Sequence, residues 1–390
     1  MGTRRHPVNR PAIVRFLALA LWLTVPPVSA QPQDSQDDRT AAEEAVSGML
    51  SDTPQINKLL IDREFPILGG RWGWEMFIDA PLNSEPEGAE LTLRRAKAKY
   101  ARNFGNHWRL KLSADYSRGG GLELSDNYFT YNGWDRTRLT LGVSDPPFSL
   151  ESVSDSSALT FMEQSLPGAS LSEGKSGGAT ILRRNQNSIL NATLVLFNVS
   201  QDDHREDGQG FVFHYVHSPI TIGQARSVHL GGSLSYRWNA SEDGTQFRSR
   251  PEVATVNDYF VDTGSIADAD RIGRVAIEAS QVAGRFSWQT EWLAASVQRN
   301  DAKTLNFWGA YAFASWFLTN DARSYDFGSG SFKLPRVHSP LLEGGWGAWE
   351  VAFRASLVDL TDGDVVGGRE DNLSLGLNWY LNDRIRVMSN

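Results

Sequence analysis

A row of basic side chains with a two-residue spacing is the feature of this sequence that most directly suggests chemistry. Arg95, Lys97 and Lys99 alternate with alanine and tyrosine. In an extended strand successive side chains point to opposite faces, so the three cations would share one face. Fixed cations on one face raise the local concentration of oppositely charged solutes. For each cation the alternative is an ordinary solvated wall position without a role in ion binding.

Two other patterns resemble catalytic or metal sites, and their surroundings argue against both. The segment 174–178 matches the G-x-S-x-G pattern of serine hydrolases, which needs a helix directly after it. The next residues, 179–182, read Ala-Thr-Ile-Leu and favour a strand. His214 and His217 are three apart, which places them on opposite faces of a strand, and no carboxylate completes a ligand set. We therefore expect no catalytic residues, no metal and no cofactor.

The elements that must position the cationic row follow from the same two-residue period. Apolar and polar residues alternate in runs of about ten, as over 108–116, 230–238, 349–357 and 373–381. Runs of this length, separated by Gly, Asn, Asp and Ser clusters, are typical of a transmembrane antiparallel β-barrel in an all-β protein. A secreted β-sandwich also alternates, but its strands average about five or six residues. The length supports about 16 strands, a size that encloses an aqueous channel.

Composition excludes several other classes of protein. The chain has 390 residues, no cysteine, 13 tryptophans and a formal net charge of -8, and its mean hydropathy is -0.36. An acidic chain without a long basic run argues against nucleic-acid binding. A bundle of transmembrane helices would need several apolar runs of about 18 residues or more. Aromatic residues near the ends of the apolar rows predict an interfacial girdle, as at Tyr116, Trp134, Trp238, Trp316 and Trp379.

The N-terminal region predicts export. Residues 1–30 carry four arginines and no acid, then an apolar run and small residues before Gln31, the layout of a cleaved signal peptide. Removal of this segment lowers the number of Lys and Arg residues from 38 to 34 and leaves the 46 Asp and Glu residues unchanged. The formal charge of the mature chain would therefore be 34 minus 46, or -12. Residues 31–64 predict an acidic periplasmic linker with a possible short helix, and residues 65–390 the barrel domain.

Several segments resemble the phosphate-selective porin O and P family. They read PFSLE at 147–151, TFME at 160–163, SLP at 165–167, GGWGAWE at 344–350 and GLNWYLN at 376–382. The resemblance runs in order over nearly the whole chain after about residue 65. It implies a 16-stranded outer-membrane barrel, usually trimeric, with arginines along the lumen and a long third loop folded into the pore. That constriction loop would be about 148–176.

The resemblance also implies roles for individual residues. Arg71 matches a first-strand position, Arg94 and Arg95 match an RRA motif in the second strand, Asp126 matches the acid of a DAY motif, and Ser156 matches a loop serine. With Lys97 and Lys99 these residues would line the pore and bind anions.

At other positions the chain departs from the family pattern. Asp145 stands where the family often has lysine, Asp155 where a loop serine is expected, Gln164 at an arginine position and Ser152 at a loop lysine position. These changes remove attraction for phosphate and add repulsion, so we expect weakened anion selectivity. The chain also ends after about half a strand, which predicts an incomplete last strand.

Together these observations predict a passive porin in the outer membrane of a Gram-negative bacterium, a homotrimer surrounded by outer-membrane lipid. Its solutes would be small anions such as inorganic phosphate. The alternatives are a general diffusion porin for small polar solutes and a non-conducting structural or adhesive barrel. An outer-membrane hydrolase is disfavoured, because no serine, histidine and acid converge on one face of a predicted strand.

Overall fold

The computed structural model describes residues 63–65, 69–79, 92–117, 121–199, 208–238, 244–252 and 258–390. The predicted signal peptide, and the predicted linker except for its last two residues, lie outside this part. The chain divides into two units, Met1–Arg63 and Glu64–Asn390. All features that follow concern the second unit. No helix among the described residues is both long and apolar enough to cross a bilayer.

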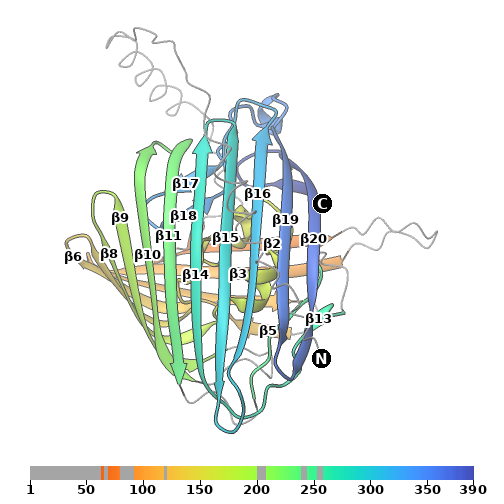
Figure 1. Cartoon of the computed structure of the whole chain (residues 1–390). Helices are drawn as coiled ribbons and strands as arrows, with labels where there is room; N and C mark the ends of the chain where they lie inside the picture. Colours follow the sequence, from red (N-terminus) through yellow and green to blue (C-terminus); the bar gives the residue numbers. More distant parts are fainter. Residues whose placement is uncertain are drawn as a thin grey trace. The chain divides into compact units, whose positions relative to one another are not determined.

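Long antiparallel strands form the wall of a β-barrel (Figure 1). Within the described ranges its sheet contains 17 strand segments, and β5 and β6 follow one another along the same neighbour, β4, so that 16 wall strands result there. The segments are β1 (Arg63–Phe65), β2 (Gly70–Asp79), β3 (Thr92–Phe104), β4 (Trp108–Ser117), β5 (Gly121–Leu124), β6 (Asn127–Trp134), β7 (Thr137–Ser144), β8 (Ser176–Arg184), β9 (Ser188–Asn198), β10 (Gln209–Ile222), β11 (Arg226–Trp238), β14 (Ala269–Ala283), β15 (Phe286–Arg299), β16 (Leu305–Phe317), β19 (Ala348–Asp362), β20 (Val365–Tyr380) and β21 (Arg386–Ser389). The predicted fold class is confirmed.

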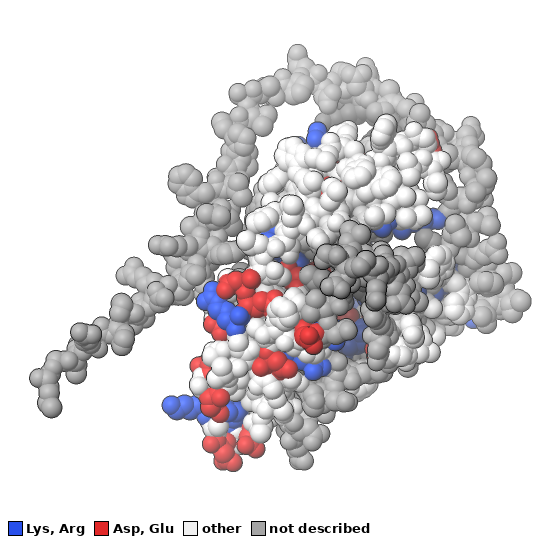
Figure 2. Space-filling view, turned by 90° about the vertical axis from the view of Figure 1, so that its right-hand side faces the viewer, with Lys and Arg blue, Asp and Glu red and all other residues white. Residues whose placement is uncertain are grey.

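The two-residue alternation separates the faces of the wall as the sequence predicts. On β4, Leu112 and Tyr116 are exposed on the outside, whereas Ser113 and Asp115 are buried inside. On β20, Leu373 and Leu375 are 72% exposed on the outer face. In the space-filling view most of one face is uncharged, and acidic and basic residues gather toward the lower left (Figure 2). Lipid therefore meets an apolar outer surface.

Three long connections fold against the inner face of the wall. The inner loop, residues 145–175 between β7 and β8, contains α3 (Leu150–Val153), the 3-10 turn η2 (Ser156–Ala158) and α4 (Leu166–Leu171). The connection from β16 to β19 contains β17 (Ser324–Asp326), β18 (Ser331–Lys333) and η3 (Leu341–Glu343). The connection from β11 to β14 contains β12 (Arg248–Ser249) and β13 (Val261–Asp262). The sequence did not indicate these short elements, which are too brief to show a period.

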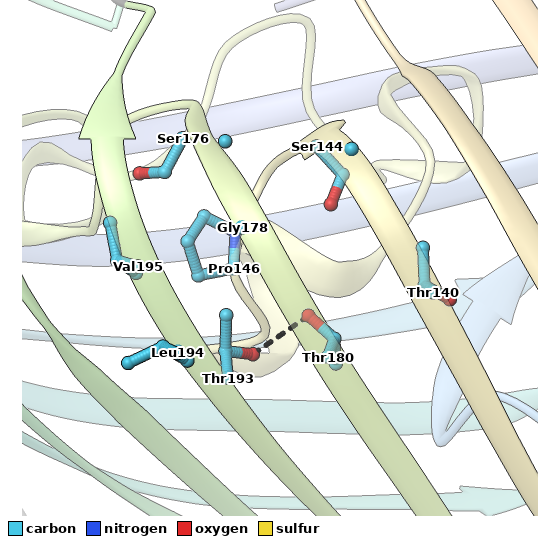
Figure 3. A pocket seen from close by; sticks show the side chains of 11 residues that line it. Thr140, Ser144, Pro146, Ser176, Gly178, Thr180, Thr193, Leu194 and Val195 are labelled. Carbon is cyan, nitrogen blue, oxygen red and sulfur yellow. Dashed lines mark hydrogen bonds between the residues drawn. The ribbon is translucent and has the colours of Figure 1, made fainter.

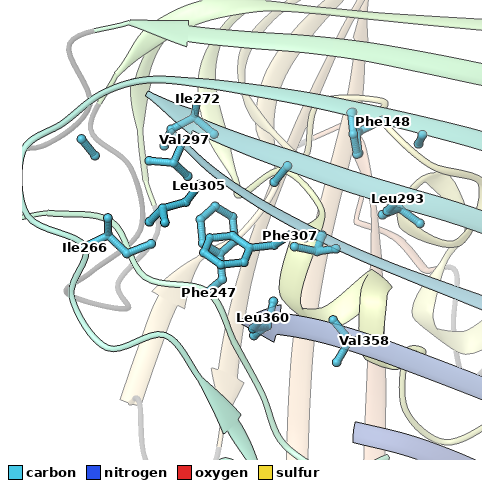
Figure 4. Close-up of a cluster of buried hydrophobic side chains, with 14 of the residues drawn as sticks. Phe148, Phe247, Ile266, Ile272, Leu293, Val297, Leu305, Phe307, Val358 and Leu360 are labelled. Carbon is cyan, nitrogen blue, oxygen red and sulfur yellow. The ribbon is translucent and has the colours of Figure 1, made fainter. Parts of the chain in front are cut away.

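Apolar side chains fill one side of the barrel interior (Figure 4). Inward residues of β14 to β16 and β19, such as Ile272, Phe307 and Val358, pack against Phe148 of the inner loop and Phe247 of the β11–β14 connection. The helix α4 lies against β15, β16 and β19. Because this side is filled, the open space of the barrel lies along the opposite wall, β2 to β9.

Candidate functional site: a charged cavity in the barrel

The inner loop is held in place by the local structure of its two short helices. Ser149 caps α3, and its hydroxyl accepts a hydrogen bond from the Ser152 amide at 3.2 Å. The Ser152 hydroxyl contacts the Ser149 amide at 3.0 Å, which completes a capping box. Ser165 caps α4, which has a proline in its first turn. Ser152, predicted as a constriction residue, therefore completes the capping box of α3 and also lines the cavity.

Buried carboxylates fasten this loop to the wall. Glu291 of β15 accepts hydrogen bonds from the amides of Leu150 (3.0 Å) and Glu151 (2.8 Å) at the start of α3. Glu151 accepts hydrogen bonds from the Ser165 amide at 3.0 Å and the Ser165 hydroxyl at 2.6 Å, and lies 3.6 Å from Arg354. Burial raises the pKa of Glu151, and the arginine offsets that effect only in part. These contacts fix the first half of the loop.

Glu173 fastens the second half. Its carboxylate, fully buried, accepts hydrogen bonds from Ser235 and Arg237 of β11, and Arg274 of β14 lies 3.2 Å away. Burial alone would raise the pKa of Glu173, but the charges of Arg274 and Arg237 outweigh it and lower the pKa below its ordinary value. The loop therefore carries a carboxylate that stays ionised against two arginines of the wall.

An open cavity of about 600 Å³ lies between the inner loop and the strands β2, β3 and β6 to β9. Its charged lining side chains are the cations Arg95, Lys97, Lys99 and Arg138 and the acids Glu75, Asp126, Asp145, Asp155 and Glu163. Four positive and five negative groups leave this lining with a formal charge of -1. The cavity is charged, but its charges nearly cancel.

The cationic row of β3 faces this cavity, and each member has an acidic partner. Arg95 donates to both oxygens of Asp115, with Nε to Oδ1 at 3.1 Å and Nη2 to Oδ2 at 2.6 Å. Lys97 lies 3.4 Å from Asp126, and Lys99 donates to Glu75 at 2.5 Å. The two-residue spacing placed the row on one face, as the structure has it, but did not reveal that Asp115, Asp126 and Glu75 pair with it.

Asp126 is shared by three lysines. Its carboxylate lies 3.4 Å from Lys97, 2.8 Å from Lys111 and 3.2 Å from Lys175 at the end of the inner loop. Lys175 also donates to Asp145 at 2.8 Å. Burial lowers the pKa of Lys175, but the charges of Asp145 and Asp126 outweigh it and raise the pKa. Three cations thus meet around one carboxylate of the chain itself.

The other predicted site residues differ in their positions. Ser156 of η2 accepts a hydrogen bond from Arg95 at 3.3 Å and donates to Glu75 at 3.4 Å, so the loop touches the cationic row. Asp155 pairs with Lys333 of β18 at 3.1 Å, and Gln164 lines the cavity. Arg71 lies exposed on β2, outside the cavity lining.

For Arg94 the structure gives only a backbone position on β3, because its side chain lies outside the described part.

Neutral hydroxyl groups of Tyr128, Thr130, Thr140 and Thr180 line the part of the cavity formed by β6 to β8. Cross-strand register places four threonines in one row over β6 to β9: Thr130, Thr140, Thr180 and Thr193. Thr180 and Thr193 are hydrogen-bonded at 2.9 Å (Figure 3). Arg138 lies one inward position beyond this row on β7. The alternation of β7 puts Arg138 and Thr140 on its polar face, but neither residue was selected from the sequence as a site residue.

The histidine interpretation needs a correction. His214 is buried inside the barrel and His217 lies on the outer parity of β10, as the spacing predicted. A carboxylate is nevertheless present: Glu278 lies 2.7 Å from His214 and 2.9 Å from His229. The sequence could not reveal it, because Glu278 is 64 residues away from His214. Among the described residues no cluster has the arrangement of a metal site.

Comparison with known proteins gives consistent relatives. The family model described as "Phosphate-selective porin O and P" matches residues 68–390. An "Uncharacterized protein" of Caulobacter vibrioides is 28% identical over 310 residues, which cover 72% of this chain and 61% of that protein. Porin O of Pseudomonas aeruginosa is 27% identical over 338 residues, which cover 75% of this chain and 74% of that protein. The chain thus spans about three-fifths of the first relative.

Among solved structures, the anion-selective porin from Comamonas acidovorans aligns with a TM-score of 0.46 and 12% identity, over 79% of this chain and 84% of that one.

Proposed function

Because the chain belongs to the phosphate-selective porin O and P family, we propose that it is an outer-membrane porin through which small solutes diffuse passively, with weakened preference for anions. Inorganic phosphate and other small anions are the first solutes to consider, and small polar solutes are the second. The process is physical, and no catalytic step is proposed. We further propose a homotrimer, a cleaved signal peptide at 1–30 and a linker at 31–64.

The observation that carries this proposal is the pairing of the cavity cations with acids of the same chain. Arg95, Lys97 and Lys99 each lie within 4 Å of a carboxylate. A cation raises the local concentration of anions through its net field, and a neighbouring carboxylate cancels most of that field at the distance of an approaching solute. The row therefore keeps its hydrogen-bond donors but loses most of its long-range attraction.

A general diffusion pore for small polar solutes is the second candidate, and the threonine row favours it. A solute in a narrow pore gives up part of its hydration shell and needs hydrogen bonds in exchange. Hydroxyl groups donate and accept, so the cavity residues of this row, Thr130, Thr140 and Thr180, serve neutral solutes as well as ions.

Reconstitution into a planar bilayer tests the proposal. Under a gradient of potassium chloride we expect channel conductance with a reversal potential that indicates a small permeability ratio of chloride over potassium. Phosphate added to the bath should reduce the chloride current only weakly. Strong anion selectivity, or block at low phosphate concentration, would overturn the weakened preference. A barrel that inserts and does not conduct would overturn the porin function.

A single variant tests whether intramolecular pairing is the cause. In Asp126→Asn the amide cannot neutralise Lys97, Lys111 and Lys175, so anion preference and phosphate block should both increase by roughly tenfold, as expected for exposing cations in a confined site. Asp364→Asn makes the same charge change on the tip between β19 and β20, away from the cavity lining, and should leave both properties unchanged. An unchanged D126N channel would contradict the explanation.

A further inference from the structure

Arg138 differs from the other cations of the cavity. It lies on β7, lines the cavity and is half-buried. Within the described residues its guanidinium has no hydrogen bond and no carboxylate within 4 Å, whereas Arg95, Lys97 and Lys99 all have acidic partners. A cation without a carboxylate in direct contact offers an anionic solute more attraction than a cation that is paired with one. Arg138 lies on β7, which β4 and β6 separate from the β3 row.

A second arginine lies beside it. Cross-strand register pairs Arg138 with Leu182 on β8, and Arg184 is two residues beyond Leu182 on the same face. Arg184 likewise forms no ion pair among the residues that the structure describes. Its guanidinium lies against Gly328, where a Cβ atom would be 3.3 Å from Nη1. The neighbouring Ser329 lines the cavity.

The acid nearest to this pair, Asp326, acts on Arg138 through its charge but forms no ion pair with either arginine among the described residues. Asp326 of β17 accepts hydrogen bonds from the Gly328 amide at 2.8 Å and the Ser329 hydroxyl at 2.9 Å, both within its own turn. The remaining lining groups of this wall are neutral: Tyr128, Thr140, Thr180 and Asn191. Arg138 and several neutral donors thus line one end of the cavity, the end at which β8 and β9 are joined by a short turn, and Arg184 lies next to this lining.

We propose that Arg138, with Arg184 and Ser329 beside it, forms an oxyanion-binding subsite in the barrel, separate from the neutralised row of β3. Its ligands are small oxyanions, meaning phosphate or the carboxylate of an organic acid, because a guanidinium donates two parallel hydrogen bonds to two oxygens of one group. The subsite rests on the proposed function, since only a conducting barrel brings solutes to it. It assigns the remaining anion preference to one wall of the pore.

Inhibition of chloride current in planar bilayers tests the subsite. Phosphate and succinate are added separately, so that the inorganic and the carboxylate ligand are distinguished. Arg138→Gln should weaken inhibition by about tenfold, the effect of losing one charge-assisted pair of hydrogen bonds, and should shift the reversal potential toward cations. Arg138→Lys keeps the charge but not the fork, so it should retain the reversal potential and lose part of the inhibition. Arg184→Gln should act like R138Q, but less.

Arg183 provides the matched control. It is adjacent to Arg184 on β8 but points to the outer face, where it donates to Thr137 at 2.9 Å. Arg183→Gln removes the same charge and should change neither property. If R138Q and R184Q both conduct with unchanged inhibition by phosphate and succinate, the subsite is overturned while the porin function stands. If the unaltered protein does not conduct, both are overturned.

Discussion

Glu173 and Arg237 form an ion pair in which both side chains are fully buried, one from the inner loop and the other from wall strand β11. Arg274 approaches the same carboxylate at 3.2 Å. In Glu173→Gln the Arg237 guanidinium would stay buried without the carboxylate that pairs with it, so the free energy of unfolding should fall by about 3 to 5 kcal/mol. Urea unfolding of the refolded barrel in lipid vesicles measures this loss.

The control for this variant is Glu343→Gln, an exposed carboxylate of η3, which should change the free energy of unfolding by less than about 0.5 kcal/mol. If E173Q also changed the free energy of unfolding by less than about 0.5 kcal/mol, the stability of the loop would not depend on this ion pair.

The same carboxylate predicts a pH dependence. Burial would raise the pKa of Glu173, but the charges of Arg274 and Arg237 hold it below the ordinary value of 4.5. A depressed pKa means that the stabilisation is fully present above pH 4.5 and is lost as pH falls through the pKa of the folded state. The difference in unfolding free energy between wild type and E173Q should be constant from pH 7 to pH 5 and should shrink below pH 4.5. A difference that shrinks between pH 7 and pH 5 would contradict the assigned direction.

Gly142 on β7 gives a prediction about the wall itself. Its φ is +135°, and a Cβ there would lie 2.3 Å from the backbone oxygen of Asn127. Gly142→Ala should therefore destabilise the barrel by at least about 1 to 3 kcal/mol through backbone strain and steric overlap. Gly273 on β14 has open space at the Cβ position, so Gly273→Ala should be nearly neutral. Heat unfolding of both variants, compared with the wild type, measures the two effects. Equal melting temperatures for both variants would show that β7 relaxes without cost.

The sequence allowed the wall to be predicted, because side-chain direction in a strand depends only on the residue's position in the alternation. Lys97, Lys111 and Arg138 all lie on the polar face that alternation assigns to them. What alternation cannot predict is which polar residues meet. Asp126 reaches Lys175, 49 residues later, and Glu173 reaches Arg274, 101 residues later, through register and loop path alone.

The inner loop was located in the sequence but its anchors were missed. Its short helices, Leu150–Val153 and Leu166–Leu171, show no period. Their caps could have been found, because Ser149 has a serine three residues later and Ser165 precedes a Leu-Pro start. Glu151 and Glu173 look like ordinary loop acids in the sequence, and only the burial that the fold imposes makes them structural.

The apolar packing inside the barrel limits where water can lie in the lumen. Strands β14 to β16 and β19 are apolar toward lipid, as at Ile277 and Phe353, and part of their inner face is apolar too, as at Ile272 and Phe307. Contact between this inner apolar patch and the water of a channel would be unfavourable. Phe148 and Phe247 cover this patch. The inner loop and the β11–β14 connection therefore have two effects at once: they fill one side of the lumen, and they keep water away from the apolar part of the wall.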